Sequence, residues 1–290
     1  MFFYEFLLDP FLSFEFMRRS LIACLALSLG CGPVGTLLVL RRMSLIGDAL
    51  SHAVLPGAAI GFMIAGLSLV SMSIGGFIAG ILVALLSGFI ARLTQQREDA
   101  SFAAFYLISL AIGVLIISMF GSNVDIMHVL FGTILAIDNE SLFLVVSITT
   151  LTLLTFAIVG RGIVVESFDP GFLKVVNGPG AILHLIFLTL VVLNLVAGFQ
   201  ALGTLMAVGL MMLPAVAARF WVQNLIKLSI LSIFFAFIAG YSGLLISFHS
   251  NLPSGPTIIL VAGFIYLFSV FFGFKDSLIT KIISRPHLEN

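Results

Sequence analysis

The sequence is poor in charged residues. Asp, Glu, Lys and Arg make up 9% of its 290 residues, whereas 61% are hydrophobic. Soluble domains carry about 25% charged residues, so this chain has too few charges to cover a surface that faces water. The composition therefore excludes a soluble globular protein and predicts a polytopic membrane protein surrounded by membrane lipid. Basic and acidic residues balance at 13 each, and we expect no nucleic-acid partner.

The sequence also lacks two common motifs of phosphate and zinc chemistry. It has no G-x-x-x-x-G-K-[ST], so the chain cannot itself hold ATP in a P-loop, and it has no H-E-x-x-H. The stretch 30–35 matches G-x-G-x-x-G, but no strand precedes it and Pro33 removes a backbone donor, which argues against a dinucleotide site. We therefore expect no enzyme and no permanently bound cofactor. Active transport would draw its energy from another subunit or from an ion gradient.

Cysteine is scarce as well. Cys24 and Cys31 lie seven residues apart on one expected helix, which separates them by about 10 Å along its axis. That is too far for a disulfide within one chain. We interpret both as small packing residues.

Long apolar runs fill most of the chain. Each has near the roughly 20 residues that span hydrocarbon, which predicts an all-α transmembrane bundle of eight to nine spans in one domain, residues 1–290. An interfacial segment, 1–16, precedes the runs; a short amphipathic piece, 125–136, and a polar stretch, 161–179, interrupt them. The expected helices are 17–40, 43–66, 69–92, 100–120, 140–160, 181–199, 203–220, 226–248 and 256–273.

The distribution of basic residues predicts the orientation. With the N-terminus outside and the C-terminus in the cytoplasm, Arg18 and Arg19 are the only basic residues outside, and the other eleven of the 13 lie inside. The same orientation gives an acidic outer face that attracts cations. Its residues are Glu5, Asp9, Glu15, Asp125, Asp138 and Glu140.

The second apolar run contains a carboxylate and an imidazole. Asp48 and His52 are four residues apart, so on a helix they share one face with Cβ atoms about 5–6 Å apart. An ionisable residue within a membrane span costs about 2.5–3.5 kcal/mol even on the lenient insertion scale. Oxygen and nitrogen ligands suit a divalent transition metal. From the residues alone, an ion site and a structural pair that locks two helices both stay open.

The surrounding stretch resembles a known family. RRMSLIGDALSHAVLPGAAIG, residues 41–61, is similar to the signature of the membrane permeases of ABC importers for zinc, manganese and iron(II). Later stretches in the same order support the resemblance, which covers about 20–272. They are VLFGTILAI (129–137), LGTLMAVGLMMLPAVAARFW (202–221) and LPSGPTIIL (252–260).

The resemblance implies a function. The chain would be the permease subunit of an ATP-driven importer in the bacterial cytoplasmic membrane, with Asp48 and His52 as metal ligands. We expect a homodimer, a cytoplasmic ABC ATPase, and a periplasmic or lipoprotein metal-binding protein that delivers the ion. Zinc is the first choice of cargo, with Mn²⁺ or Fe²⁺ as the alternative. A gradient-driven secondary transporter is the alternative from another class.

The polar stretch carries a helix start. Asp169 followed by Pro170 is typical of an N-cap and a first helical residue. Phe172 and Leu173 would give this short helix an apolar face for a partner. The resemblance implies that 161–179 is the coupling segment that touches the ATPase, whereas the residues alone also fit an ordinary capped loop.

A few isolated polar residues are candidates for the ion pathway. Each could instead be a packing residue whose hydrogen bonds are satisfied. They are His184, Asn194, His128, Asp125 and His249.

Overall fold

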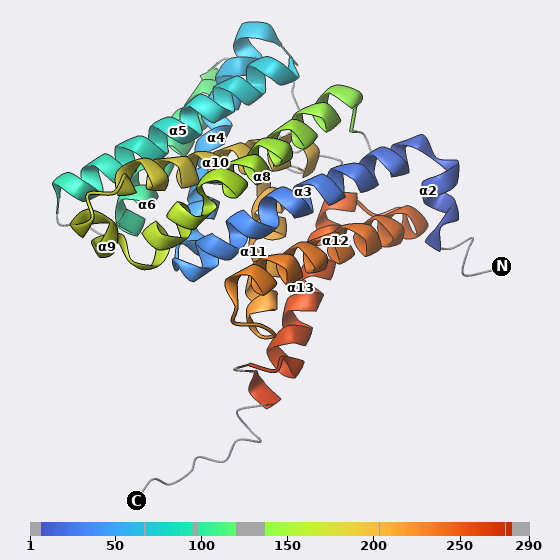
Figure 1. Ribbon diagram of the computed structural model, residues 1–290. Coiled ribbons are helices and arrows are strands. Elements are labelled where there is room, and N and C mark those ends of the chain that lie inside the picture. The colour runs from blue at the N-terminus through green and yellow to red at the C-terminus, as the bar shows by residue number, and fades with distance from the viewer. Residues whose placement is uncertain are drawn as a thin grey trace, which may run out of the picture.

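The computed structural model describes residues 7–66, 68–94, 98–119, 137–202, 204–275 and 277–279. Within these residues the secondary structure is helical, which confirms the predicted fold class (Figure 1). The helices are α2 (Asp9–Ser13), α3 (Glu15–Leu40), α4 (Ser44–Ala65), α5 (Leu69–Leu93), α6 (Glu98–Met119), α8 (Asn139–Phe168), α9 (Pro170–Val175), α10 (Gly180–Leu202), α11 (Thr204–Arg219), α12 (Leu225–Ser250) and α13 (Ser254–Phe272).

Eight helices in the described part of the chain are long and apolar enough to cross a membrane. They are α3, α4, α5, α6, α8, α10, α12 and α13. The expected span 203–220 is instead the 16-residue α11. At 1.5 Å per residue this helix is about 24 Å long, shorter than the roughly 30 Å of hydrocarbon.

The fifth expected helix is longer than the sequence predicts. Its predicted end at residue 160 is wrong, because α8 has 30 residues and continues through Arg161 and Glu166. Charged residues alone do not end a helix. The helix ends where Asp169 and Pro170 restart the chain as α9, since a residue before proline is disfavoured in helical geometry.

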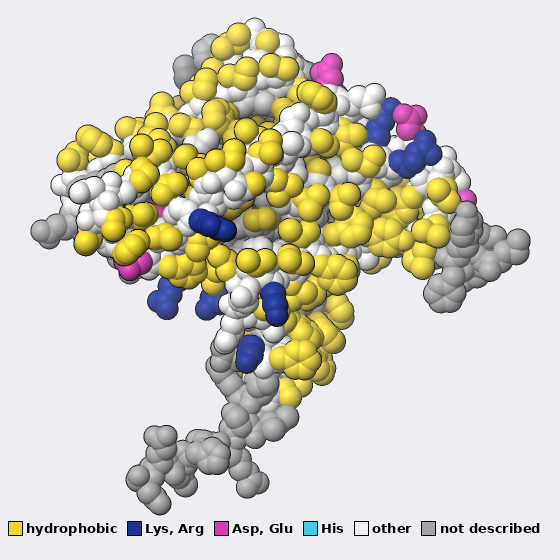
Figure 2. Space-filling view, viewed as in Figure 1, with side chains coloured by type: hydrophobic (Ala, Val, Ile, Leu, Met, Phe, Trp, Pro, Cys, Tyr) yellow, Lys and Arg dark blue, Asp and Glu magenta, His cyan; other side chains and the backbone are white. Residues whose placement is uncertain are grey.

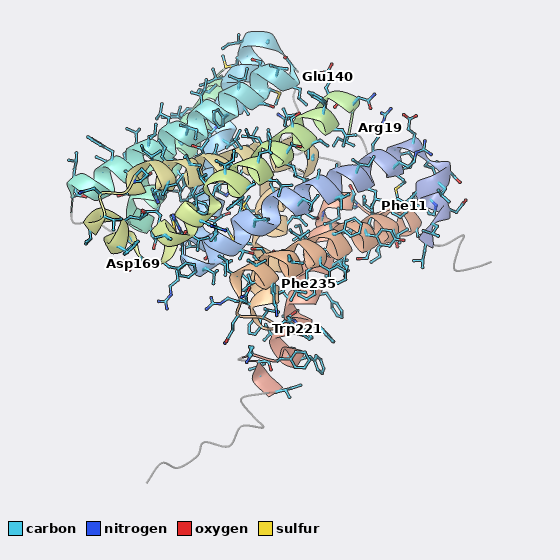
Figure 3. The ribbon with its side chains drawn as sticks, in the orientation of Figure 1. Phe11, Arg19, Glu140, Asp169, Trp221 and Phe235 are labelled. Atoms are coloured by element: carbon cyan, nitrogen blue, oxygen red, sulfur yellow. The ribbon has the colours of Figure 1, made fainter. Side chains whose placement is uncertain are left out.

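Contacts between segments that are far apart in the sequence mark the two opposite ends of the bundle. At one end the Tyr241 hydroxyl donates to the Leu7 carbonyl over 2.9 Å, and the Phe14 and Phe248 rings meet at 5.4 Å. At the other end the Lys275 amide donates to the Phe220 carbonyl over 2.8 Å. Figure 3 shows Arg19 and Glu140 towards the first end and Asp169 at the second.

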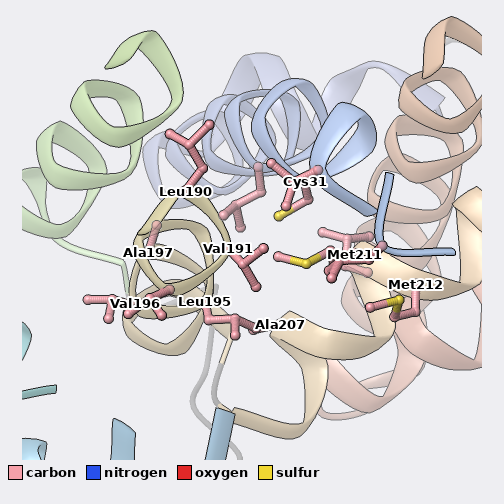
Figure 4. Close-up of a cluster of buried hydrophobic side chains, with 14 of the residues drawn as sticks. Cys31, Leu190, Val191, Leu195, Val196, Ala197, Ala207, Met211 and Met212 are labelled. Atoms are coloured by element: carbon pink, nitrogen blue, oxygen red, sulfur yellow. The ribbon is translucent and has the colours of Figure 1, made fainter. Parts of the chain in front are cut away.

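Buried apolar side chains of α3, α10 and α11 form the centre of the bundle (Figure 4). Cys31 of α3 faces Val191 of α10 and Met211 of α11 in this cluster. Cys31 and Cys24 are both free and buried, which confirms the interpretation that they pack rather than pair. The face in Figure 2 is largely hydrophobic, and its charged side chains lie mainly towards the margins, as a surface in contact with lipid requires.

A side chain caps the first turn of α8. The Asp138 carboxylate accepts a 2.8 Å hydrogen bond from the Ser141 amide. Hydrogen bonds from the side chain and backbone of Ser141 hold the pKa of Asp138 below its ordinary value. This cap fixes the helix start directly after the part of the chain, 120–136, that lies outside the described residues.

Glycine allows α4 and α5 to touch backbone to backbone. The sequence places Gly57 four residues before Gly61, a spacing that supports close helix approach. A Cβ built on Gly57 would lie 2.0 Å from the Gly75 carbonyl oxygen, and one built on Gly61 would lie 2.4 Å from the Ser71 carbonyl oxygen. The Ser71 hydroxyl also donates to the Gly61 carbonyl over 2.9 Å. No side chain fits between these backbones.

We therefore expect Gly57→Ala to destabilise the protein. Overpacking costs about 1–3 kcal/mol, and each kcal/mol lowers the melting temperature of a chain this large by about 2–4 °C. Gly88→Ala is the matched control, because a Cβ at Gly88 meets nothing within 4 Å and alanine is the better helix former. Thermal unfolding of the purified variants in detergent measures both. Equal melting temperatures for the two variants would contradict the close contact between α4 and α5.

Candidate functional site

A tight turn positions the helix that carries the candidate metal ligands. After α3 ends, the Arg42 amide donates to the Val39 carbonyl over 3.1 Å and the Met43 amide donates to the Leu38 carbonyl over 2.9 Å. Together with a φ of 59° at Arg42, this is the Schellman arrangement in which a left-handed residue ends a helix. Helix α4 starts at Ser44 directly after it.

Asp48 and His52 come together on one face of α4, as their spacing predicts. The His52 Nε2 and Asp48 Oδ1 atoms are 3.8 Å apart, within ion-pair range but longer than a hydrogen bond. The Asp48 side chain is 57% exposed and the His52 side chain 30% exposed. The pair therefore lies on the surface of this chain rather than in its interior.

Helix α6 supports the imidazole from behind. The Tyr106 ring stacks on the His52 ring with centroids 6.0 Å apart, and the Ser109 hydroxyl donates to the Ala53 carbonyl over 3.3 Å. A Cβ on Gly113 would lie 3.1 Å from the ring of Pro56, so α6 also packs closely at the proline of α4. Tyr106 belongs to no motif of the sequence, and no local pattern predicts its contact with His52.

One ring nitrogen of His52 makes no hydrogen bond to the described residues. His52 Nδ1 is buried and makes no hydrogen bond to any residue that the structure describes. Buried polar atoms are normally satisfied, so His52 lacks at this nitrogen the hydrogen bond that is usual for a buried structural histidine. Across the described ranges, no group of three or more His, Cys, Asp or Glu residues could hold a metal. One chain therefore offers two side-chain ligands at this position, fewer than a closed metal site has.

The other candidate pathway residues lie elsewhere. Asn194 is 1% exposed, and its amide donates to Thr152 Oγ1 and to the Leu190 carbonyl, each over 2.8 Å, so it joins α10 to α8. His249 is in the last turn of α12 with its ring edge against Phe248. Asp125 and His128 lie outside the described residues, as does all but the last residue of 129–137. The pathway roles of all these residues stay predictions.

His184 takes part in a polar junction at the end of the bundle where α4 begins. Its Nδ1 lies 3.0 Å from Arg41 Nη1, and the Arg41 Nε donates to the Ser167 hydroxyl over 2.7 Å. The Arg41 guanidinium also lies over the Phe187 ring at 4.5 Å. These contacts join the end of α3 to α8 and α10. The junction borders a cavity of about 460 Å³ lined by residues that include Arg42, Asp99, Glu166 and Pro170.

The predicted cap and first residue of α9 are confirmed. The Asp169 carboxylate accepts a 2.9 Å hydrogen bond from the Phe172 amide, and Pro170 is the first helical residue. Leu173 is buried and holds α9 against the bundle, whereas Phe172 is 54% exposed. Other apolar side chains within ten residues of Phe172 in the sequence are also exposed, so this region presents apolar side chains at the surface. They are Phe168, Val175, Val176 and Ile182.

Comparisons with known proteins agree with this architecture. The model of the ABC 3 transport family matches residues 13–273. The chain is 30% identical over 277 residues to the manganese transport system membrane protein MntC of Halalkalibacterium halodurans, covering 95% of this chain and 94% of that protein. It is 28% identical over 286 residues to the chelated iron transport system membrane protein YfeD of Yersinia pestis, covering 97% of this chain and 95% of that one.

A solved structure has the same fold. The structure of PsaBC from Streptococcus pneumoniae in complex with Fab matches with a TM-score of 0.83 and 30% sequence identity, covering 95% of this chain and 98% of that chain. Both matches cover most of the chain rather than one motif, and the residues of the family match include α4 and α9. The chain therefore belongs to the ABC 3 transport family, as a multi-pass metal-importer permease of the bacterial cytoplasmic membrane.

Proposed function

We propose that this chain is the permease subunit of an ATP-driven importer in which Asp48 and His52 form a transient station for a divalent transition metal. One observation carries the proposal: the two side chains lie 3.8 Å apart on the exposed face of a helix long enough to span the membrane. Carboxylate oxygen and imidazole nitrogen are both accepted by manganese, iron(II) and zinc. Each chain supplies only two side-chain ligands, so neither copy alone closes the site around the ion and the ion can leave.

The exposure of the pair supports a second copy of the chain beside it. An Asp or His that faced lipid at this depth would be strongly disfavoured, so the open face of α4 adjoins a water-lined route or another protein surface. In a homodimer with the two α4 helices near the two-fold axis, each copy contributes the same pair. Four ligands would then surround the ion, the number typical of a closed zinc site.

The choice of cargo metal follows from the names of the similar proteins and from the hardness of the ligands. The sequence alone favours zinc, whereas the similar proteins are named for manganese and for chelated iron. A carboxylate beside each imidazole is also a harder ligand set than histidine or cysteine alone, and harder ligands suit manganese. We therefore place Mn²⁺ first, with Fe²⁺ and Zn²⁺ as competitors to be compared in the same uptake assay.

We propose that the end bearing the α3–α4 turn faces the cytoplasm. Basic residues gather at this end, as the positive-inside rule requires, and among the described residues they include Arg41, Arg42, Lys174, Arg219 and Lys275. The opposite end would receive the ion from a metal-binding protein outside. Its exposed acidic residues would attract cations there. They are Asp9, Glu15, Asp138 and Glu140.

The apolar surface of α9 is the proposed docking site for the ATPase. Exposed Phe172 projects from a short capped helix beyond the end of α8, where a groove in a cytoplasmic partner could receive it. Because the chain has no P-loop, ATP hydrolysis by that partner would supply the energy for transport.

We expect Asp48→Asn and His52→Gln each to stop metal uptake by cells or proteoliposomes that contain the complete transporter. Both variants keep the approximate size of the side chain but remove a charge or a ring nitrogen. Loss of an outer hydrogen-bond partner alone costs metal sites about 10–100-fold, so loss of a ligand should reduce uptake at least as much. Glu140→Gln, the same acid-to-amide change at an exposed helix start, removes one of four exposed acidic residues at the outer end and should lower uptake far less than either pair variant. Normal uptake in both pair variants would return Asp48 and His52 to a structural role.

We expect Phe172→Ser to weaken binding of the ATPase without loss of the folded permease. The change removes the exposed ring but leaves the Asp169 cap and buried Leu173 in place. Phe274→Ser is the comparison variant, because Phe274 is also an exposed aromatic residue, 74% accessible, beyond the end of α13. The amount of ATPase that co-purifies with each tagged permease measures the effect. Undiminished co-purification with Phe172→Ser would rule out α9 as the docking helix.

A further inference from the structure

We infer that Arg41 is a positioning residue that transmits movement of the ATPase-docking helix to the metal pair. The inference rests on the proposed function and adds to it a specific mechanical link. Arg41 is the C-cap of α3, immediately before the turn into α4. Its side chain reaches α8 and α10 at the point where both adjoin α9.

Contacts with α8 and α10 hold the guanidinium in place. Its Nε donates to the Ser167 hydroxyl over 2.7 Å, its Nη1 donates to His184 Nδ1 over 3.0 Å, and its Cζ lies 4.5 Å from the Phe187 ring centroid. Since arginine has no acceptor, the His184 ring must accept through Nδ1 and carry its proton on Nε2. The planar guanidinium donates hydrogen bonds in two directions while it stacks on a ring, a geometry that the ammonium group of lysine cannot reproduce.

On one side this junction connects to the docking helix. Ser167 lies in the last turn of α8, two residues before Asp169, whose carboxylate caps α9. Ser167 also donates to the Ile163 carbonyl over 2.5 Å, so its hydroxyl is fixed to the α8 backbone. A displacement of α9 therefore moves the hydroxyl that Arg41 bonds.

On the other side the junction connects to the metal pair through a stiff turn. The hydrogen bonds of Arg42 and Met43 back to α3 and the left-handed backbone of Arg42 leave little freedom between Arg41 and Ser44. A left-handed conformation at a residue other than glycine costs about 1–2 kcal/mol. The hydrogen bonds back to α3 hold Arg42 in this conformation despite that cost. Asp48 follows Arg41 by seven residues, about two helical turns.

The space beside the junction allows the helices to move. The cavity of about 460 Å³ lies between the α3–α4 turn, the start of α6 and the α8–α9 connection, where Asp99, Glu166 and Pro170 line it. A close-packed interface would resist relative displacement, whereas this junction combines the directional hydrogen bonds of Arg41 with an adjacent cavity. Arg41 thus joins α9 to α4 at a place where the rest of the interface can change.

The test is the ratio of metal imported to ATP hydrolysed by the complete transporter in proteoliposomes. Arg41→Gln should leave ATPase association and ATP hydrolysis close to wild type while the ratio falls about ten-fold or more, within the usual range of coupling between sites. Arg41→Lys should rescue the ratio only in part. Arg219→Gln is the matched control, because Arg219 is an exposed arginine at the end of α11 in the same basic end and outside the coupling segment, and it should leave the ratio unchanged.

Two further variants keep the inference testable if Arg41→Gln fails to fold. Ser167→Ala and His184→Gln each remove one partner and leave the arginine in place, and each should lower the ratio by a smaller factor. An unchanged ratio in these variants, or loss of ATPase binding in parallel with uptake, would overturn the inference. Absence of ATP-dependent metal uptake by the wild-type transporter would instead refute the proposed function.

Discussion

The electrostatic cost of placing ionisable groups in an apolar layer governs this structure. Asp48 and His52 lie on a helix long and apolar enough to span the membrane, with their side chains partly exposed, and contact of these groups with lipid would be unfavourable. The opposite faces of α4 are closed: α5 approaches it through Gly57 and Gly75, and α6 through Tyr106 and Gly113. The pair is thus confined to the one face of α4 on which an ion, water or a second copy of the chain can meet it.

The start of the same helix is linked to the proposed coupling segment. Arg41 lies three residues before α4 begins and donates to Ser167, which is two residues before the Asp169 cap of α9. The proposed ligands and the proposed docking helix are far apart in sequence, yet the Arg41 contact and a tight turn connect them in the fold. This arrangement suits a transporter, because a site that must open and close has to be mechanically connected to the subunit that consumes ATP.

Local chemistry explains which features the sequence predicts well. The apolar runs become the long helices, Asp169 and Pro170 become the cap and first residue of α9, and the four-residue spacing puts Asp48 beside His52. Contacts across the fold could not be predicted in this way. Arg41 meets partners 126 and 143 residues away, and no periodicity signals such distant pairs. The full length of α8 could not be predicted either, because the charged residues Arg161 and Glu166 in its last turns are also typical of a loop.

The most direct test of the account is the ligand set of the bound ion. Pulsed electron paramagnetic resonance of Mn²⁺ held by the purified transporter detects coupling to nitrogen nuclei that coordinate the metal. The account predicts imidazole nitrogen in the coordination sphere of the wild-type protein, a change in that coupling when histidine carries ¹⁵N, and its loss in His52→Gln. A bound ion that shows the same nitrogen coupling in His52→Gln, or none in the wild-type protein, would contradict it.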